Sequence, residues 1–320
     1  MPILLLKKTR RWAFLRHGKK QGWHPFWAAF GAAVLVLLPL VGGTVLFTRQ
    51  NLRRQWQTAE PQSGIAVHLP KAADRLTVLV CTPRAEGAPG FALLYLNASQ
   101  NCVHILTLPA ETAVPFGGGD ATLADAYAAA GPARCREALL EPLALPEETR
   151  YLALSASVLS AVADRYGMLR VGFSGALTAD DLAACGAAGA VQSLSVREAQ
   201  TFLSALPGSI PPQRQAAARA AVWDAFFRQD LELLPTTLPA ALRANSSALL
   251  TDLSAQDLLM LEETLEFLAN NAASVFSDAL PGEWDAAAGR YTLTDASRAA
   301  MQSFFNVSPT AGQASSASEP

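Results

Sequence analysis

The sequence lacks the groupings of cysteine and histidine that bind zinc. Its 320 residues include four cysteines and four histidines, without a Cys-x-x-Cys pair and without a cluster that would supply four ligands. A structural zinc site needs such ligands at short spacings, so none is predicted. A disulfide between Cys81 and Cys102 is left open, since both fall in predicted strands, but buried free thiols are the expectation.

Acidic residues are absent from the first 25 positions, which carry seven lysines and arginines. Charged residues of either sign are then absent from residues 26–47, "FWAAFGAAVLVLLPLVGGTVLF", and these 22 residues would form a helix of about 33 Å, enough to cross a bilayer. A cleaved signal peptide has a similar pattern, but "TRQNLRRQW", which follows, contains no small-x-small cleavage site. We therefore predict an uncleaved signal-anchor, with a basic cytoplasmic segment at 1–25 and a transmembrane helix at 26–47.

The distribution of cations predicts the orientation of this span. Seven cations precede it and three follow it closely, which places the N-terminus in the cytoplasm and the C-terminal domain outside a cell membrane crossed once. A basic terminus alone would also fit a nucleic-acid-binding arm. Because an apolar span follows, the membrane is the expected partner and no nucleic acid is.

The remaining residues are predicted to form one α/β domain between two polar segments. Residues 48–72 are polar with scattered prolines and are expected to be a stalk, whereas 306–320 are too small and polar to pack and are expected to be disordered. Within residues 73–305, the strands "RLTVLVC", "FALLYLN" and "CVHILTLP" precede alternating helices and strands. This alternation predicts an extracytoplasmic α/β/α domain, with helices on both faces of a central mixed sheet. Gly131 and Pro132 are expected to separate two helices.

No set of side chains assembles into a recognisable catalytic group. His104 lies in a predicted apolar strand and is expected to be structural. The glycine run "FGGGD" at 116–120 lacks the Gly-Lys-Ser/Thr ending of a phosphate-binding loop and is predicted to be a flexible loop. Trp223, Phe226 and Phe227 follow helical spacing, which favours a place in the core over a ligand-binding box.

The order of these pieces resembles the LytR-CpsA-Psr family, membrane-anchored proteins of the bacterial cell envelope. In that family a strand beginning Ser-Asp-Thr leads to an Asn-Pro hairpin, and the next strand ends in Pro-Arg-Asp-Thr. Asn97 is similar to the hairpin residue, and Leu108, Pro109 and Thr112 are similar to the strand end. The segments "TLADAYAAAGP", "LSVREAQTFL", "RQ" at 214–215 and "TDLSAQDLL" resemble later family motifs in the same order, so that the likeness covers residues 74–305.

The resemblance implies transfer of a glycopolymer from a polyisoprenyl pyrophosphate lipid to peptidoglycan, with Mg²⁺ as cofactor if the site is active. Such chemistry needs arginines that clamp the pyrophosphate and carboxylates that hold the metal. The sequence departs from the family at these positions. The expected charged residues are replaced by Pro89, Ala110, Ser204, Leu206 and Pro211.

The family positions that keep a polar side chain supply the candidate site. Glu111, Arg214 and Gln215 are the catalytic candidates, and no metal ligands are predicted. The expected rim of the ligand pocket consists of Pro109, Ala110, Glu111, Thr112, Tyr127 and Arg214.

Three functions are open at this point. The first is a degenerate, non-catalytic member, a pseudoenzyme that acts in cell-wall glycopolymer attachment or assembly by binding a lipid carrier, a cell-wall glycan or a partner. The second is an active phosphotransferase with relocated ligands, for which Asp120, Asp125 and Arg134 are candidates beside Glu111 and Arg214. The third is a purely structural membrane anchor. The loss of charged residues at the clamp positions favours the first.

Overall fold

The computed structural model describes residues 75–84, 89–187 and 189–306. The predicted cytoplasmic segment, transmembrane helix and stalk, and almost all of the predicted tail, lie outside these ranges. Within them, no helix combines the length and apolar character needed to cross a membrane. The first described strand, β1, begins at Arg75, as the sequence predicts.

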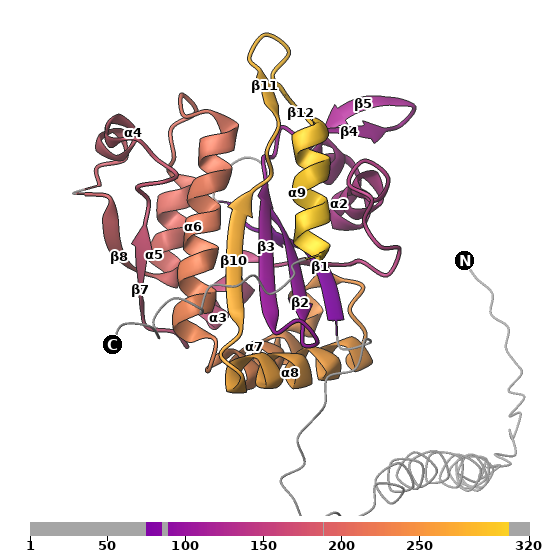
Figure 1. Ribbon diagram of the computed structural model, residues 1–320, viewed down its shortest axis with the longest axis vertical. Helices are drawn as coiled ribbons and strands as arrows, with labels where there is room; N and C mark the ends of the chain where they lie inside the picture. Colours follow the sequence, from indigo (N-terminus) through magenta and orange to yellow (C-terminus); the bar gives the residue numbers. More distant parts are fainter. Residues whose placement is uncertain (1–74, 85–88, 188, 307–320) are drawn as a thin grey trace, which may run out of the picture. The chain divides into compact units, whose positions relative to one another are not determined.

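A mixed sheet of six strands forms the centre of the fold, in the order β10-β3-β2-β1-β6-β9 (Figure 1). Strands β1, β2 and β3 pair antiparallel, β10 runs parallel to β3, β6 runs parallel to β1, and β9 closes the far edge antiparallel to β6. The strands are Arg75–Thr82 (β1), Gly90–Asn97 (β2), Cys102–Leu108 (β3), Arg150–Ala153 (β6), Leu250–Thr251 (β9) and Ser274–Ala279 (β10). The predicted central mixed sheet is confirmed.

Both faces of this sheet are buried, which explains why its long strands are almost continuously apolar. In β1, Val78 and Val80 belong to one hydrophobic core, whereas Leu79 and Cys81 belong to a second core on the opposite face. Helices α3, α5, α6, α7 and α8 contribute to the first core, and α2 and α9 to the second. We call these the α6 face and the α2 face of the sheet.

Local sequence signals account for most of the helix starts. Thr122, Thr178, Ser195 and Ser254 each cap a helix, and an aspartate or glutamate three residues later completes a capping box. The helices are Leu123–Leu140 (α2), Ala156–Ala163 (α3), Ala179–Ala184 (α4), Val196–Ser204 (α5), Pro212–Asp230 (α6), Leu234–Ala244 (α7), Ala255–Asn270 (α8) and Asp295–Phe305 (α9).

The predicted break between two helices at Gly131 and Pro132 is present inside α2. Gly131 has φ 74° and ψ −170°, outside the helical region, so the two helical pieces of α2 meet at a kink. Proline lacks a backbone N–H and fits the first turn of the second piece. The kink therefore follows directly from the sequence.

Three small hairpins accompany the sheet in the described part of the chain. The predicted flexible loop at 116–120 is instead the turn of one of them, because Gly117 and Gly118 adopt φ values of 62° and 86° that favour glycine. The strand that begins at Met168 pairs in a separate hairpin and does not join the central sheet. The hairpins are Ala113–Phe116 with Gly119–Thr122 (β4, β5), Met168–Gly172 with Val191–Ser195 (β7, β8) and Glu283–Asp285 with Arg290–Thr292 (β11, β12).

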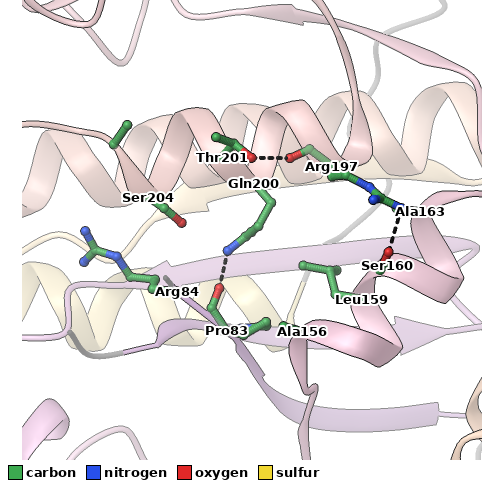
Figure 2. Close-up of a pocket in the computed structure, with 11 residues that line it drawn as sticks. Pro83, Arg84, Ala156, Leu159, Ser160, Ala163, Arg197, Gln200, Thr201 and Ser204 are labelled. Carbon is green, nitrogen blue, oxygen red and sulfur yellow. Dashed lines mark hydrogen bonds between the residues drawn. The ribbon is translucent and has the colours of Figure 1, made fainter. Parts of the chain in front are cut away.

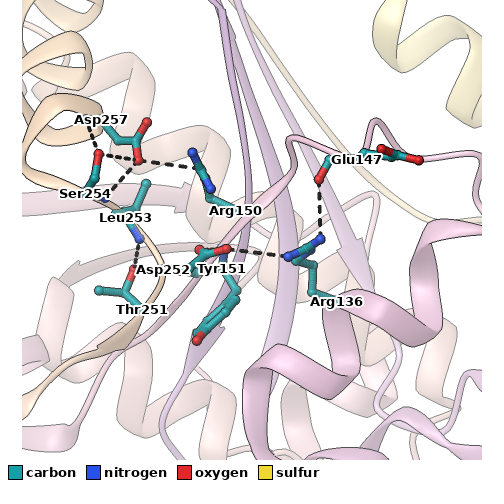
Figure 3. A network of polar contacts seen from close by, with 9 residues as sticks. All are labelled: Arg136, Glu147, Arg150, Tyr151, Thr251, Asp252, Leu253, Ser254 and Asp257. Atoms are coloured by element: carbon teal, nitrogen blue, oxygen red, sulfur yellow. Dashed lines mark hydrogen bonds and ion pairs between the residues drawn. The ribbon is translucent and has the colours of Figure 1, made fainter.

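A polar network fixes the short edge strand β9 (Figure 3). The Asp252 carboxylate accepts a hydrogen bond of 2.7 Å from the backbone N–H of Tyr151. Its Oδ2 also lies 3.6 Å from the Nη1 of Arg136 in α2. Next to it, Arg150 of β6 lies 3.5 Å from Asp257, the residue that completes the cap of α8. These contacts join β6, β9, α2 and α8 at one end of the sheet.

Candidate ligand site

A narrow apolar cavity lies between the α6 face of the sheet and the helices that cover it. It encloses about 110 Å³, and its walls include Val80 of β1, Leu94 of β2 and Leu238 of α7. Apolar cavities of about this size in other proteins stay dry and take up apolar ligands. Two hydroxyl groups hold α6 over the sheet beside it: the Oγ1 of Thr107 donates to the carbonyl of Ala216, and the Oγ of Ser277 donates to that of Ala220.

The aromatic residues of α6 form one wall of this cavity. Trp223, Phe226 and Phe227 all line it, with ring centroids 6.0 Å apart between Trp223 and Phe227 and 5.6 Å apart between the two phenylalanines. Phe226 and Phe227 are buried in the hydrophobic core, and Trp223 packs against it. Their predicted place in the core is confirmed, and the same side chains also surround the cavity.

Two arginines line the cavity where β1 ends and β2 begins, Arg84 shortly after β1 and Arg219 of α6 beside Gly90. Only 6% of Arg219 is exposed. Burial lowers the pKa of its guanidinium to about 10, the charge of Arg84 acts in the same direction, and the charge of Glu111 opposes them. The Nε of Arg84 is also buried, and it has no hydrogen-bond partner in the described part of the chain. This end of the cavity therefore gathers cationic donors, a preferred setting for an anion.

A wider, open depression adjoins the cavity, and we call it the vestibule (Figure 2). It measures about 590 Å³ and shares Arg84, Leu159 and Gln200 with the cavity. The Gln200 amide donates to the carbonyl of Pro83, while Arg84 and Ser204 lie at one end of the vestibule and Arg197 at the other. A molecule bound across both would have an apolar part in the cavity, an anionic group at the arginines and a remainder in the vestibule.

Solved structures share this arrangement of elements, although no family model and no curated protein matches the sequence. One is TagT bound to LIIa-WTA, at 15% identity over 77% of this chain and 96% of that chain, with a TM-score of 0.57. Another is a LytR-Csp2A-Psr enzyme from Actinomyces oris, at 16% identity over 72% of this chain and 89% of that chain, with a TM-score of 0.54. The chain has the LytR-CpsA-Psr fold. A candidate transcription regulator from Eubacterium siraeum, at 15% identity over 76% of this chain and 95% of that chain, also matches it, with a TM-score of 0.60.

The predicted rim forms a closed turn in this LytR-CpsA-Psr fold. Thr112 is fully buried, its Oγ1 donates to the carbonyl of Pro109, and its own carbonyl accepts from the N–H of Leu123 at the start of α2. Ala110 is buried as well. Glu111 is half-buried, and it is the rim residue whose charge acts on Arg219. Glu111 lines neither the cavity nor the vestibule, so the rim contributes to this site only the charge that acts on Arg219.

The other predicted residues lie elsewhere. Tyr127 packs on the α2 face, with its ring centroid 5.8 Å from that of Phe91. Arg214 is bonded to the Asp181 carboxylate, which caps α4, and the Gln215 amide donates to the carbonyl of Ile210. None of these predicted residues lines the cavity or the vestibule.

The positions at which uncharged residues replace the charged residues typical of the LytR-CpsA-Psr family lie in different environments. Pro89 and Leu206 are buried, whereas Ser204 lines the vestibule. Of the relocated ligands considered above, Asp125 caps α2 and Arg134 pairs with Glu137 on an exposed helical surface. Within the described ranges, no three of the histidine, cysteine, aspartate and glutamate side chains form a group that could hold a metal ion.

The sequence prediction missed Arg84 and Arg219, although a local signal for Arg219 exists. Arg219, Trp223 and Phe226 are spaced four and three residues apart, so a single cation continues the apolar stripe of α6. A charged residue on a stripe that packs against a sheet must be desolvated, which is costly without a function or a partner. Arg84 has no comparable signal in the sequence.

Proposed function

We propose that the chain is a membrane-anchored protein of the cell envelope that binds a polyisoprenyl phosphate carrier and does not transfer its glycan. The observation that carries this proposal is the buried Arg219 at the mouth of an apolar cavity. The LytR-CpsA-Psr fold supports a role in cell-wall glycopolymer metabolism, as does the TagT structure named as bound to LIIa-WTA. The anchor at 26–47 belongs to the proposal and lies outside the described residues.

The cavity and its mouth together suit an amphiphile with an apolar chain and an anionic head. Each methylene of the chain that is buried contributes about 0.8 kcal/mol. At the mouth, a desolvated guanidinium is unfavourable until an anion approaches, and charge-assisted hydrogen bonds to a phosphate offset that cost. A neutral lipid would fill the cavity and leave the arginine without an anion.

The absence of transfer is proposed from the side chains at the clamp positions. Pro89, Ala110 and Leu206 carry no charge where the family resemblance implies an acid or an arginine. The alternative is an active phosphotransferase in which Arg84, Arg219 and Glu111 replace the family's ligands, with Mg²⁺ as cofactor. The charge of Glu111, which acts on Arg219, supports this alternative. A purely structural anchor would have no use for a desolvated cation in a cavity.

The test is a titration of the full-length chain in detergent micelles with farnesyl phosphate. Since Trp223 lines the cavity, its fluorescence is expected to change saturably, and the Trp223→Phe variant supplies the background of the other tryptophans. Arg219→Gln is expected to weaken binding at least tenfold, and Arg214→Gln is the matched control in the same helix. A folded protein that binds farnesyl phosphate no better than farnesol would overturn the proposal. Release of glycan phosphate to a peptidoglycan acceptor in the same preparation would establish the alternative.

A further inference from the structure

The mouth of the cavity gathers two cations where a lipid head group would lie. We propose that it is a single-phosphate site, so that the chain selects the carrier as its monophosphate over the pyrophosphate form. This inference rests on the proposed function and adds to it the chemical form of the ligand.

The two arginines are suited to share one phosphate. Both arginines line the cavity at the same strand ends, Arg84 shortly after β1 and Arg219 beside Gly90 at the start of β2. Their two positive charges therefore lie at one end of the cavity, and the charge of Arg84 acts on Arg219. The single negative charge of Glu111 opposes this repulsion. Two planar donor groups around one tetrahedral anion match the geometry in which arginine binds phosphate best.

A second phosphate would lie in the vestibule, where Arg197, the described cation other than Arg84, is already paired with a carboxylate. The Nη2 of Arg197 lies 2.6 Å from the Asp164 carboxylate and 2.6 Å from the Ser160 hydroxyl. The Gln200 amide is bonded to Pro83, and the Thr201 hydroxyl donates to the Arg197 carbonyl at 3.0 Å. Ser204 has a hydroxyl to offer but no charge. The extra negative charge of a pyrophosphate therefore meets neutral or occupied groups among the described residues.

A lipid carrier that has donated a glycan phosphate from its pyrophosphate is also released as a monophosphate. In such a transfer the acceptor oxygen forms a new bond to phosphorus, the P–O–P bridge breaks, the acceptor proton goes to solvent and the carrier keeps one phosphate. The chain would then bind the carrier after a reaction of this class rather than before it.

The experiment titrates the full-length chain in detergent micelles with farnesyl phosphate, farnesyl pyrophosphate and farnesol, with and without Mg²⁺. We expect the monophosphate to bind at least tenfold more tightly than the pyrophosphate, with no effect of Mg²⁺ on the order. If farnesyl pyrophosphate binds more tightly than the monophosphate, or if both bind equally and with much higher affinity than farnesol, the selection of the monophosphate is contradicted. The proposed function would still stand in that case. Binding of neither phosphate above farnesol would overturn the proposed function as well.

A second variant tests the role of the vestibule. Asp164→Asn releases Arg197 from its carboxylate partner and is expected to raise affinity for the pyrophosphate several-fold, with no change for the monophosphate. Glu137→Gln is the control, because it releases Arg134 from a similarly exposed ion pair away from the vestibule. If Asp164→Asn improves both ligands equally, or neither, the assignment of the second phosphate to the vestibule is contradicted.

Discussion

Gly90 of β2 leaves the space in which the side chain of Arg219 lies. A Cβ atom at Gly90 would be 3.3 Å from both the Cδ and the Nε of Arg219, and 2.7 Å from the Oγ1 of Thr82. Distances below about 3 Å force a neighbouring group to move, as close packing leaves little slack. The missing side chain of one strand residue thus sets the position of a buried cation from a distant helix.

The first prediction concerns this contact. Gly90→Ala is expected to displace Thr82 and Arg219, to lower the free energy of unfolding by about 1–3 kcal/mol, as overpacking usually does, and to weaken farnesyl phosphate binding several-fold. Chemical denaturation and the lipid titration measure the two effects. Gly172→Ala is the matched control, since Gly172, like Gly90, is a terminal residue of a strand, and a Cβ there would meet no atom within 4 Å. Equal losses of binding in both variants would refute the account of Arg219.

The second prediction separates Arg214 from the ligand site. Arg214→Gln removes the partner of Asp181, a buried carboxylate that caps α4. Burial raises the pKa of Asp181, but hydrogen bonds from Thr178 and the Arg214 charge together lower it below its usual value. The ionised Asp181 therefore stabilises the fold at pH values above the pKa that it has in the unfolded chain. This stabilisation is lost as the pH falls through its lower pKa in the folded chain.

We expect Arg214→Gln to lower the free energy of unfolding by about 1 kcal/mol at neutral pH and to leave lipid affinity unchanged. The difference from the parent protein should shrink in acid, which urea denaturation at several pH values measures. A tenfold loss of affinity in this variant would return Arg214 to the binding site.

The third prediction concerns His104, whose predicted place in an apolar strand is confirmed by its burial in β3. It is buried among aromatic rings, with Phe276 at 4.7 Å and Phe304 at 5.9 Å between centroids, and its Nε2 has no hydrogen-bond partner in the described ranges. Burial lowers the pKa of His104 to about 4. Between this pH and about 6.5 the unfolded chain binds the proton and the folded chain does not, so stability falls as the pH is lowered.

His104→Phe should remove this part of the pH dependence. Between pH 7 and pH 4, the free energy of unfolding of the parent protein is expected to fall by on the order of 3 kcal/mol more than that of the variant, given about 1.4 kcal/mol for each pKa unit. Paired urea titrations give the comparison, and titration of the carboxylates cancels between the two proteins. Parallel curves for both would contradict the assignment.

The fourth prediction fills the cavity. Leu238 is half-buried in α7 and lines the cavity opposite the sheet, so Leu238→Phe should occupy space that a lipid chain would need. Calorimetry is expected to give a loss of farnesyl phosphate affinity of at least tenfold, while affinity for inorganic phosphate stays as it is. Leu259→Phe, at an exposed position of α8, is the control. If Leu238→Phe leaves lipid affinity unchanged, the hydrocarbon chain of the lipid does not bind in this cavity.

The fifth prediction uses the cysteines, all four of which are free thiols. Burial raises the pKa of Cys102 to about 11 and that of Cys135 to about 12, and it raises the pKa of Cys81 further. Cys185 is only partly buried, so a thiol reagent should modify it first and reach the others only on unfolding. Mass spectrometry after short labelling identifies the site, and early modification of Cys81 would contradict the burial of β1.

Much of the fold follows from the sequence because its signals are local. The run "RLTVLVC" is predicted as a strand and is found as β1, and the capping box of Thr178 and Asp181 at the start of α4 consists of residues three positions apart. Strand β10 was missed because "SVFSDA" is short and half-exposed, and its partner β3 lies far away in the chain. The prediction of a flexible loop for the glycine run at 116–120 is wrong, because the hairpin there depends on pairing between β4 and β5.

What the sequence alone determined is the α/β class, the order of its elements and the resemblance to a family whose clamp residues this chain has replaced. The tertiary structure decided which polar residues meet. It brings Arg84 and Arg219 to one end of an apolar cavity, where the charge of Glu111 acts on Arg219, and it pairs Arg214 with Asp181 away from it. The reason is physical: strands and caps are stabilised by neighbours a few residues away, whereas a buried arginine is positioned only when α6 packs on the sheet.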